Sequence, residues 1–182
     1  MSFIASLKRL VAGAPPSPIE SLYDRVVQIA RQPEFYVDGG VPDTMDGRFD
    51  MVVLILSLLM LRLEAETGTD PRHPAAQLSA DLADHFIADM EGNLRQDGIG
   101  DQSVPKHMGR MMAALGGRLG AYRGTSGDAQ SMIEALRRNL YRGEPVADAA
   151  AAFVAGKAMR AAEQLRAAPF ARLAAGQLEI SV

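Results

Sequence analysis

A run of apolar residues from Met51 to Leu63, MVVLILSLLMLRL, limits the folds open to this chain more than any other feature. Asp50 and Glu64 bound the run, which is shorter than the roughly 20 residues that a membrane-spanning helix needs. A helix that is apolar on nearly every side must be covered by other elements. The sequence therefore predicts a central core helix around which the rest of the chain packs.

Most other segments space their apolar side chains three or four residues apart, as amphipathic helices do. Helices are expected around 22–29, 75–96, 104–122, 132–140 and 153–165, with a long loop over 33–50 and a short extended tail over 176–182. The 182 residues suit one domain with one core. The predicted fold is all-α, a single-domain helical bundle of about six to seven helices.

Residues 1–14 are predicted to form an N-terminal amphipathic helix, separate from a helical domain over 15–182. Phe3 and Leu7 belong to its apolar stripe, and a proline-rich break follows at 14–18. Because Lys8 and Arg9 follow only a short apolar patch, the segment is not a secretory signal, and we expect a cytoplasmic protein. The stripe suits peripheral contact with the inner membrane or with a partner, and packing against its own domain is the alternative.

The amino-acid composition limits the kinds of site that the chain can form. The absence of cysteine excludes disulfides, zinc sites built on thiolates and cysteine nucleophiles. A net charge of -3 gives no support for specific nucleic-acid binding. Asp81, His85 and Asp89 share a helix face at a spacing that suits either a metal ion or a solvated surface. We predict no metal and no cofactor.

The stretch from Gly98 to Met108, GIGDQSVPKHM, combines glycines with a lysine. A phosphate-binding loop needs a strand before the glycines and a hydroxyl residue after the lysine, whereas here a helix precedes and His107 follows Lys106. The residues instead predict a helix start, with Ser103 as the cap and Pro105 in the first turn. A small anion- or phosphate-binding enzyme using Lys106 and His107 stays an alternative.

Methionine is frequent, with ten methionines and no tryptophan. Met90, Met108, Met111 and Met112 fall near the same predicted corner. Methionine fills irregular cores and also lines adaptable surfaces that accept varied apolar partners, and both interpretations stay open. Met108 and Met111 are therefore candidate partner-binding residues.

Small residues gather on a second face of the predicted helix 104–122, at Gly109, Ala113, Gly116, Gly117 and Gly120. A glycine inside a helix costs about 0.5–1 kcal/mol relative to alanine. A repeated cost of this kind is expected where another backbone approaches closely. The approaching backbone belongs either to this domain or to a partner helix.

Three stretches resemble the ubiquinol–cytochrome c chaperone family. They are Met45-Asp46-Gly47-Arg48-Phe49-Asp50, the segment from Asp89 to Gln96 that continues through Gly98 to Lys106, and Gly117-Arg118-Leu119 with Tyr122. The resemblance covers roughly residues 20–142 and identifies a bacterial relative, with the helical fold of that family.

The resemblance implies a non-enzymatic chaperone that binds newly made cytochrome b during assembly of the cytochrome bc1 complex. Contact with the ribosome and with a small partner protein is implied as well, while the oligomeric state is left open. The residues that the resemblance assigns to client or partner binding are Arg48, Asp101, Lys106, Arg118 and Tyr122. A helical scaffold with a different client is the remaining alternative.

Overall fold

The computed structural model describes residues 15–96, 103–125 and 127–181, and it contains helices and no strand over these ranges. The helices are α2 (Pro18–Ala30), α3 (Pro33–Val37), α4 (Met45–Thr67), α5 (Pro74–Gln96), α6 (Val104–Arg123), α7 (Ala129–Asn139), α8 (Asp148–Ala167) and α9 (Phe170–Ala174). Six of them are long, and α3 and α9 have five residues each. The predicted all-α bundle is confirmed.

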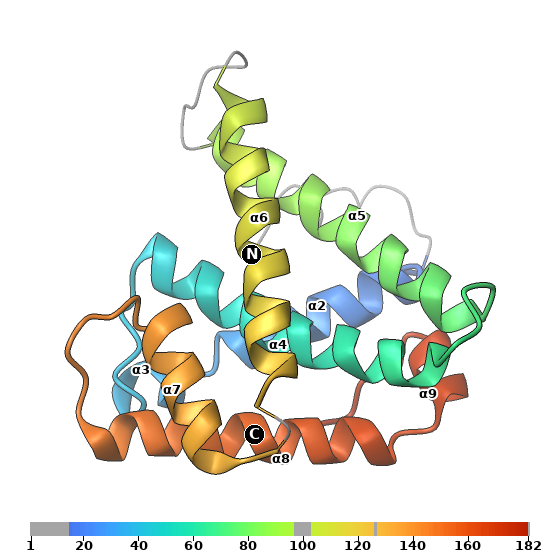
Figure 1. The fold of residues 1–182 in the computed structure, drawn as a ribbon. Helices are drawn as coiled ribbons and strands as arrows, with labels where there is room; N and C mark the ends of the chain where they lie inside the picture. Colours follow the sequence, from blue (N-terminus) through green and yellow to red (C-terminus); the bar gives the residue numbers. More distant parts are fainter. Residues whose placement is uncertain (1–14, 97–102, 126, 182) are drawn as a thin grey trace.

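Helix α4 is the predicted central helix. It packs against α2, α5, α6 and α8, and Figure 1 shows it crossing the middle of the molecule. Every residue from Met51 to Leu59 is buried, because neighbours cover the helix on several sides. Thr44 caps its start by accepting a hydrogen bond from the Gly47 N–H at 3.1 Å.

Helices α5 and α6 pack against each other and rise together from the body of the molecule (Figure 1). Leu82, Phe86, Met90 and Leu94 are buried on α5, as their spacing predicts. Helix α8 runs along the opposite side of α4 and packs against α7. The beginning of α6 is thus among the parts of the molecule farthest from α8.

The prediction of a long loop over 33–50 is wrong. Pro33 starts the short helix α3, whose Phe35 is buried, and α4 begins at Met45. Proline fixes a backbone angle that suits the first helical turn, so it begins a helix here as well as ending the preceding one. The remaining loop, 38–44, contains the glycines and the proline that dominate the sequence pattern.

Two smaller expectations also differ from the structure. Ser103 precedes α6, but its side chain makes no capping hydrogen bond, because its backbone is already helical. Helix α9, which the sequence did not predict, precedes the tail, and residues 177–181 form neither helix nor strand. Leu178 and Ile180 of the tail bury their side chains in the core. Arg25 holds this tail by donating to the Leu178 and Ile180 carbonyl oxygens.

The predicted N-terminal amphipathic helix, 1–14, lies outside the described residues. Across the described ranges, no helix combines the length and apolarity that crossing a bilayer requires.

Candidate functional site

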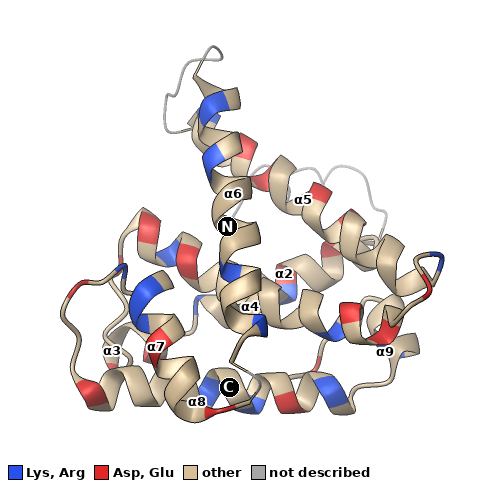
Figure 2. Ribbon diagram, in the orientation of Figure 1, with Lys and Arg blue, Asp and Glu red and all other residues tan. Residues whose placement is uncertain are grey.

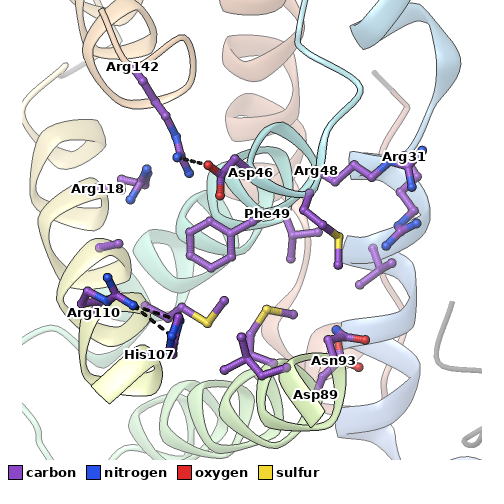
Figure 3. A pocket seen from close by; sticks show the side chains of 17 residues that line it. Arg31, Asp46, Arg48, Phe49, Asp89, Asn93, His107, Arg110, Arg118 and Arg142 are labelled. Atoms are coloured by element: carbon purple, nitrogen blue, oxygen red, sulfur yellow. Dashed lines mark hydrogen bonds and ion pairs between the residues drawn. The ribbon is translucent and has the colours of Figure 1, made fainter. Parts of the chain in front are cut away.

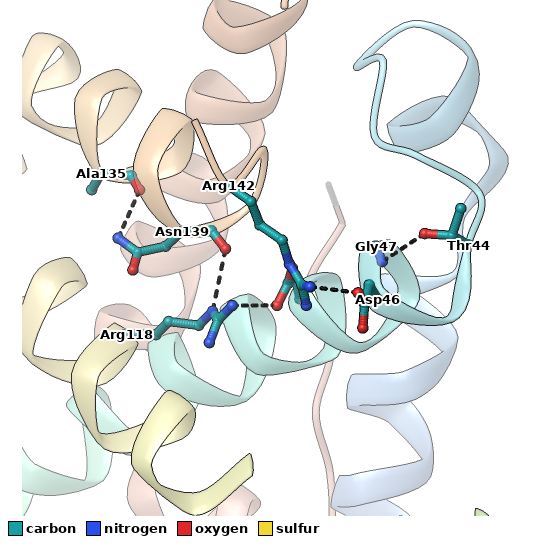
Figure 4. A network of polar contacts seen from close by, with 8 residues as sticks. Thr44, Asp46, Gly47, Arg118, Ala135, Asn139 and Arg142 are labelled. Carbon is teal, nitrogen blue, oxygen red and sulfur yellow. Dashed lines mark hydrogen bonds and ion pairs between the residues drawn. The ribbon is translucent and has the colours of Figure 1, made fainter. Parts of the chain in front are cut away.

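A buried carboxylate organises the start of α4 (Figure 4). Asp50 is fully buried and accepts hydrogen bonds at 2.6 Å from Nη2 of Arg118 on α6 and from Nε of Arg142 after α7. Arg142 also donates from Nη1 to Asp46 at 2.5 Å, and Arg118 donates from Nε to the Asn139 carbonyl oxygen at 3.3 Å. One carboxylate therefore joins three elements that are distant in the sequence.

Two opposing influences act on the pKa of Asp50 in this network. Burial raises the pKa of Asp50 above its ordinary value, although both guanidinium groups act in the opposite direction. The hydrogen bond to Asp50 raises the pKa of Arg142. Removing one partner of a buried pair such as Asp50 with Arg118 typically costs about 3–5 kcal/mol, because the other charge stays buried without compensation. The network therefore fixes how Arg118 and Arg142 are presented.

Both of these arginines line a groove of about 690 Å³ between α2, α4, α5 and α6, called here the arginine groove (Figure 3). Its apolar lining includes Met45, Phe49, Val52, Met90, Leu94 and Met111. Its arginines are Arg31, Arg48, Arg110, Arg118 and Arg142. A surface of this kind can receive an apolar segment and pair with charges beside it.

Phe49 lies in the middle of the groove and connects the groove to the core. Its ring centroid is 6.0 Å from that of Phe86 and 5.6 Å from Cζ of Arg118. Both contacts are within the range of favourable aromatic and cation–π interactions. The ring is therefore supported from below and on one side, and it offers a firm apolar surface.

The two helices that form one end of the groove carry opposite charge (Figure 2). Helix α6 contains Lys106, Arg110, Arg118 and Arg123 and no acidic residue. Helix α5 contains Asp81, Asp84, Asp89 and Glu91, with Arg95 as its one Lys or Arg residue. Five arginines and two carboxylates, Asp46 and Asp89, line the groove, so its excess of positive charge is a local feature of a chain whose net charge is -3.

Comparisons with known proteins agree with this architecture. The profile of the family described as "Ubiquinol-cytochrome C chaperone" matches residues 37–180. The chain belongs to this family. A crystal structure of the Cbp3 homolog from Brucella abortus is similar, with a TM-score of 0.79, 31% identity, and 99% of this chain and 97% of that chain covered. No curated protein matches the chain.

In this family member, the structure brings three of the seven predicted site residues together. Arg48, Arg118 and Met111 line the arginine groove. Met108, next to Met111 on α6, is half-buried and packs against the core. Lys106 is exposed, and it lines neither the arginine groove nor a second groove that lies between α4, α6 and α8.

Tyr122 does not line the arginine groove. Tyr122 is buried, and burial raises the pKa of its hydroxyl, which makes no hydrogen bond to a described residue. It belongs to the second groove of about 990 Å³ between α4, α6 and α8, which Met159, Arg160 and Arg166 also line. Asp101 lies outside the described residues.

Sequence reasoning missed Arg31 and Arg142 as groove residues. Nothing local marks an arginine at the end of α2 or after α7 as belonging to a site at the start of α4. Phe49 and Asp50 could have been predicted as site residues, because both stand in the stretch that resembles the family. Asp50 is followed directly by the apolar run, and a carboxylate so close to a buried helix needs a partner.

The small-residue face of α6 turns away from this domain. A Cβ atom added at Gly109, Gly116, Gly117 or Gly120 would have no described atom within 4 Å outside its own stretch of helix. Packing against another helix of this domain is therefore wrong as an explanation for these glycines. Contact with a partner helix stays a prediction.

The polar face of α5 is used for packing. His85 contacts the Tyr23 ring with centroids 4.9 Å apart, and Asp89 accepts a hydrogen bond from the Tyr23 hydroxyl at 3.0 Å. Burial, together with the Asp89 charge, raises the pKa of Tyr23. Among the described residues, no three His, Asp or Glu side chains lie close enough to hold a metal ion.

Proposed function

We propose that this protein is a non-enzymatic assembly factor that binds newly made cytochrome b during assembly of the ubiquinol–cytochrome c reductase (bc1) complex. Membership of the chaperone family supports the assembly role. The observation that carries the proposal is the arginine groove, an accessible surface that combines methionine and phenylalanine side chains with five arginines.

The groove meets the physical needs of a temporary client. Cytochrome b is a bundle of apolar helices, which need cover before they reach their partners. Methionine adapts to varied apolar shapes because its side chain is unbranched and flexible. A groove open to solvent also releases its client readily, since only part of the client surface is covered at a time.

The geometry gives less support to the alternative function, an enzyme that binds a small anion or phosphate through Lys106 and His107. His107 lines the arginine groove, but both ring nitrogens lie near Nη2 of Arg110, at 2.9 and 3.2 Å. Lys106 is exposed outside the groove, so the two residues do not face a shared substrate position. A scaffold for a different client uses the same surface and is separated by the identity of the bound protein.

Co-purification tests the proposal. Tagged protein isolated from cells should recover cytochrome b, and deletion of the gene should lower the amount of assembled bc1 complex. Met111→Ser, which removes apolar contact from the groove, should lower recovery by about tenfold, given that burying a methionine contributes roughly 1.5–3 kcal/mol.

Met159→Ser is the matched control, because Met159 is also half-buried but lines the second groove. Circular dichroism should show that both variants fold. Recovery of a different protein in place of cytochrome b, or equal losses in the two variants, would contradict the proposal.

A further inference from the structure

We propose that the arginine groove recognises an apolar helical segment of the client that carries carboxylates beside its apolar stripe, and that Arg31 and Arg110 are the residues that pair with them. The inference rests on the proposed function, because it names the chemistry of the client segment that the groove receives.

Ion pairs within the protein leave these two arginines available. Arg118 and Arg142 are matched by Asp50 and Asp46, which accept their hydrogen bonds. Arg48 is paired with Asp43 at 2.6 Å, and this contact raises the pKa of Arg48. Their charges are therefore already compensated inside the protein.

Arg31 and Arg110 differ from the other three. Both are exposed, and neither makes an ion pair with a described residue. Nη2 of Arg110 lies 2.9 and 3.2 Å from the two ring nitrogens of His107. Arg31 stands at the end of α2. The hydrogen bond from Arg48 lowers the pKa of the Asp43 carboxyl, and the charge of Arg31 adds to this effect without a direct ion pair. A guanidinium group presents a planar set of donors that matches a carboxylate, so each is a ready partner for an acidic side chain.

Their positions favour a protein segment over a lipid. Figure 3 shows Arg31 and Arg110 on opposite sides of the groove, with Phe49 between them. An anionic lipid carries its charge at one end, whereas a helix can place a carboxylate on either side of an apolar stripe. The N-terminal stripe of this chain is a poor occupant, because residues 1–14 include Lys8 and Arg9 and no acidic residue.

The two arginines also make the groove selective between client segments that are flanked by different charges. Cytoplasmic loops of membrane proteins are enriched in lysine and arginine. Two guanidinium groups that make no ion pair with a described residue disfavour a segment flanked by such residues, because like charges repel. The groove therefore prefers the apolar segments of a membrane protein that are flanked by acidic residues.

Synthetic helices test the inference with the purified full-length protein. The probes are three alanine–leucine helices of about 18 residues, roughly 27 Å long, which carry one residue on each side of the leucine stripe, either two Glu, two Gln or two Lys. The Glu peptide should bind about tenfold more tightly than the Gln peptide at low salt, and the Lys peptide most weakly. The preference should shrink at about 0.5 M salt, where exposed charges are screened.

The double variant Arg31→Gln with Arg110→Gln should lose the preference for Glu over Gln while still binding the apolar helix. Arg160→Gln with Arg166→Gln, in the second groove, is the matched control and should keep it. Equal binding of the Glu and Gln peptides, no binding of any peptide, or an unchanged preference in the groove variant overturns the inference.

Two further outcomes would assign the groove to another occupant and overturn the inference. One is that vesicles containing phosphatidylglycerol bind through Arg31 and Arg110 while the peptides do not. The other is self-association that the same double variant abolishes. Failure to recover cytochrome b from cells, with the peptide preference intact, would instead reject the proposed client and leave the groove chemistry standing.

Discussion

The turn that begins α4 and the outward face of α6 both contain glycine, but the space around these glycines differs. A Cβ atom added at Gly47 would lie 2.0 Å from the Pro42 carbonyl oxygen, and one at Gly39 would lie 2.5 Å from the Phe35 carbonyl oxygen. Added at Gly116, it would meet no described atom within 4 Å outside its own stretch of helix. The first region needs glycine for its own fold, whereas the second accepts the cost of glycine without an internal contact.

The same contrast applies to charge. Near Gly47, Asp50 is fully buried between two arginines. On α6, exposed Arg110 makes no ion pair with a described residue. One region is closed by its own contacts, and the other remains available to a partner. The following predictions test this comparison, beginning with the largest expected effect.

Asp50→Ala should destabilise the protein most, by about 3–5 kcal/mol, because Arg118 and Arg142 would lose their shared buried partner. Urea unfolding followed by circular dichroism measures the change. Asp43→Ala, which breaks the exposed pair with Arg48, is the control and should leave the midpoint unchanged. Equal effects would mean that the network at Asp50 is not the closed region described above.

Gly47→Ala should cost about 1–3 kcal/mol, because the new methyl group would displace the loop at Pro42. The free energy of unfolding and the yield of folded protein are the measurements. A neutral Gly47→Ala would show that the turn has more room than the structure indicates.

Tyr141→Phe should cost about 1 kcal/mol at neutral pH, since the buried hydroxyl donates to the Gly39 carbonyl oxygen at 2.6 Å. Burial raises the pKa of Tyr141 to about 12. The folded state thus retains this proton more strongly than the unfolded state, whose tyrosine pKa is about 10. The extra stability is complete below about pH 10 and declines as the pH rises toward 12, so the difference between the two proteins should narrow there.

Gly116→Ala should have the smallest effect and the opposite sign, a stabilisation of about 0.5–1 kcal/mol. Its Cβ would enter open space in a regular helix. Gly68→Ala is a useful contrast, because Gly68 also has open space but a φ of +55°, which an alanine adopts poorly. Destabilisation by Gly116→Ala would show that this face is packed in solution.

The sequence alone is sufficient to predict the helices whose apolar residues recur at a clear helical spacing. The core helix at Met51, the buried stripe of α5 and the loss of helix before Pro33 all follow from local spacing. The start of α4 does not, because Gly39, Gly40 and Pro42 resemble a long loop unless the cap at Thr44 is recognised. The first turn of α4 contains polar residues, so in the sequence it looks like a continuation of the loop that precedes it.

The candidate site was predictable only in part, for a related reason. Arg48 and Arg118 stand in stretches that resemble the family, and Met111 belongs to a methionine-rich helix. Arg31 and Arg142 reach the same groove through tertiary packing, which brings the ends of α2 and α7 to the beginning of α4. Tyr122 stands near Arg118 in the sequence pattern, but it is buried and belongs to the lining of the second groove.

The central claim is that the arginine groove is the surface that receives the client. Photo-crosslinking in cells tests it most directly, with a photoreactive amino acid placed at Met111 in the groove or at Met159 in the second groove. We expect cytochrome b to be crosslinked from Met111 and not from Met159. Crosslinking of cytochrome b from Met159 alone would contradict the account.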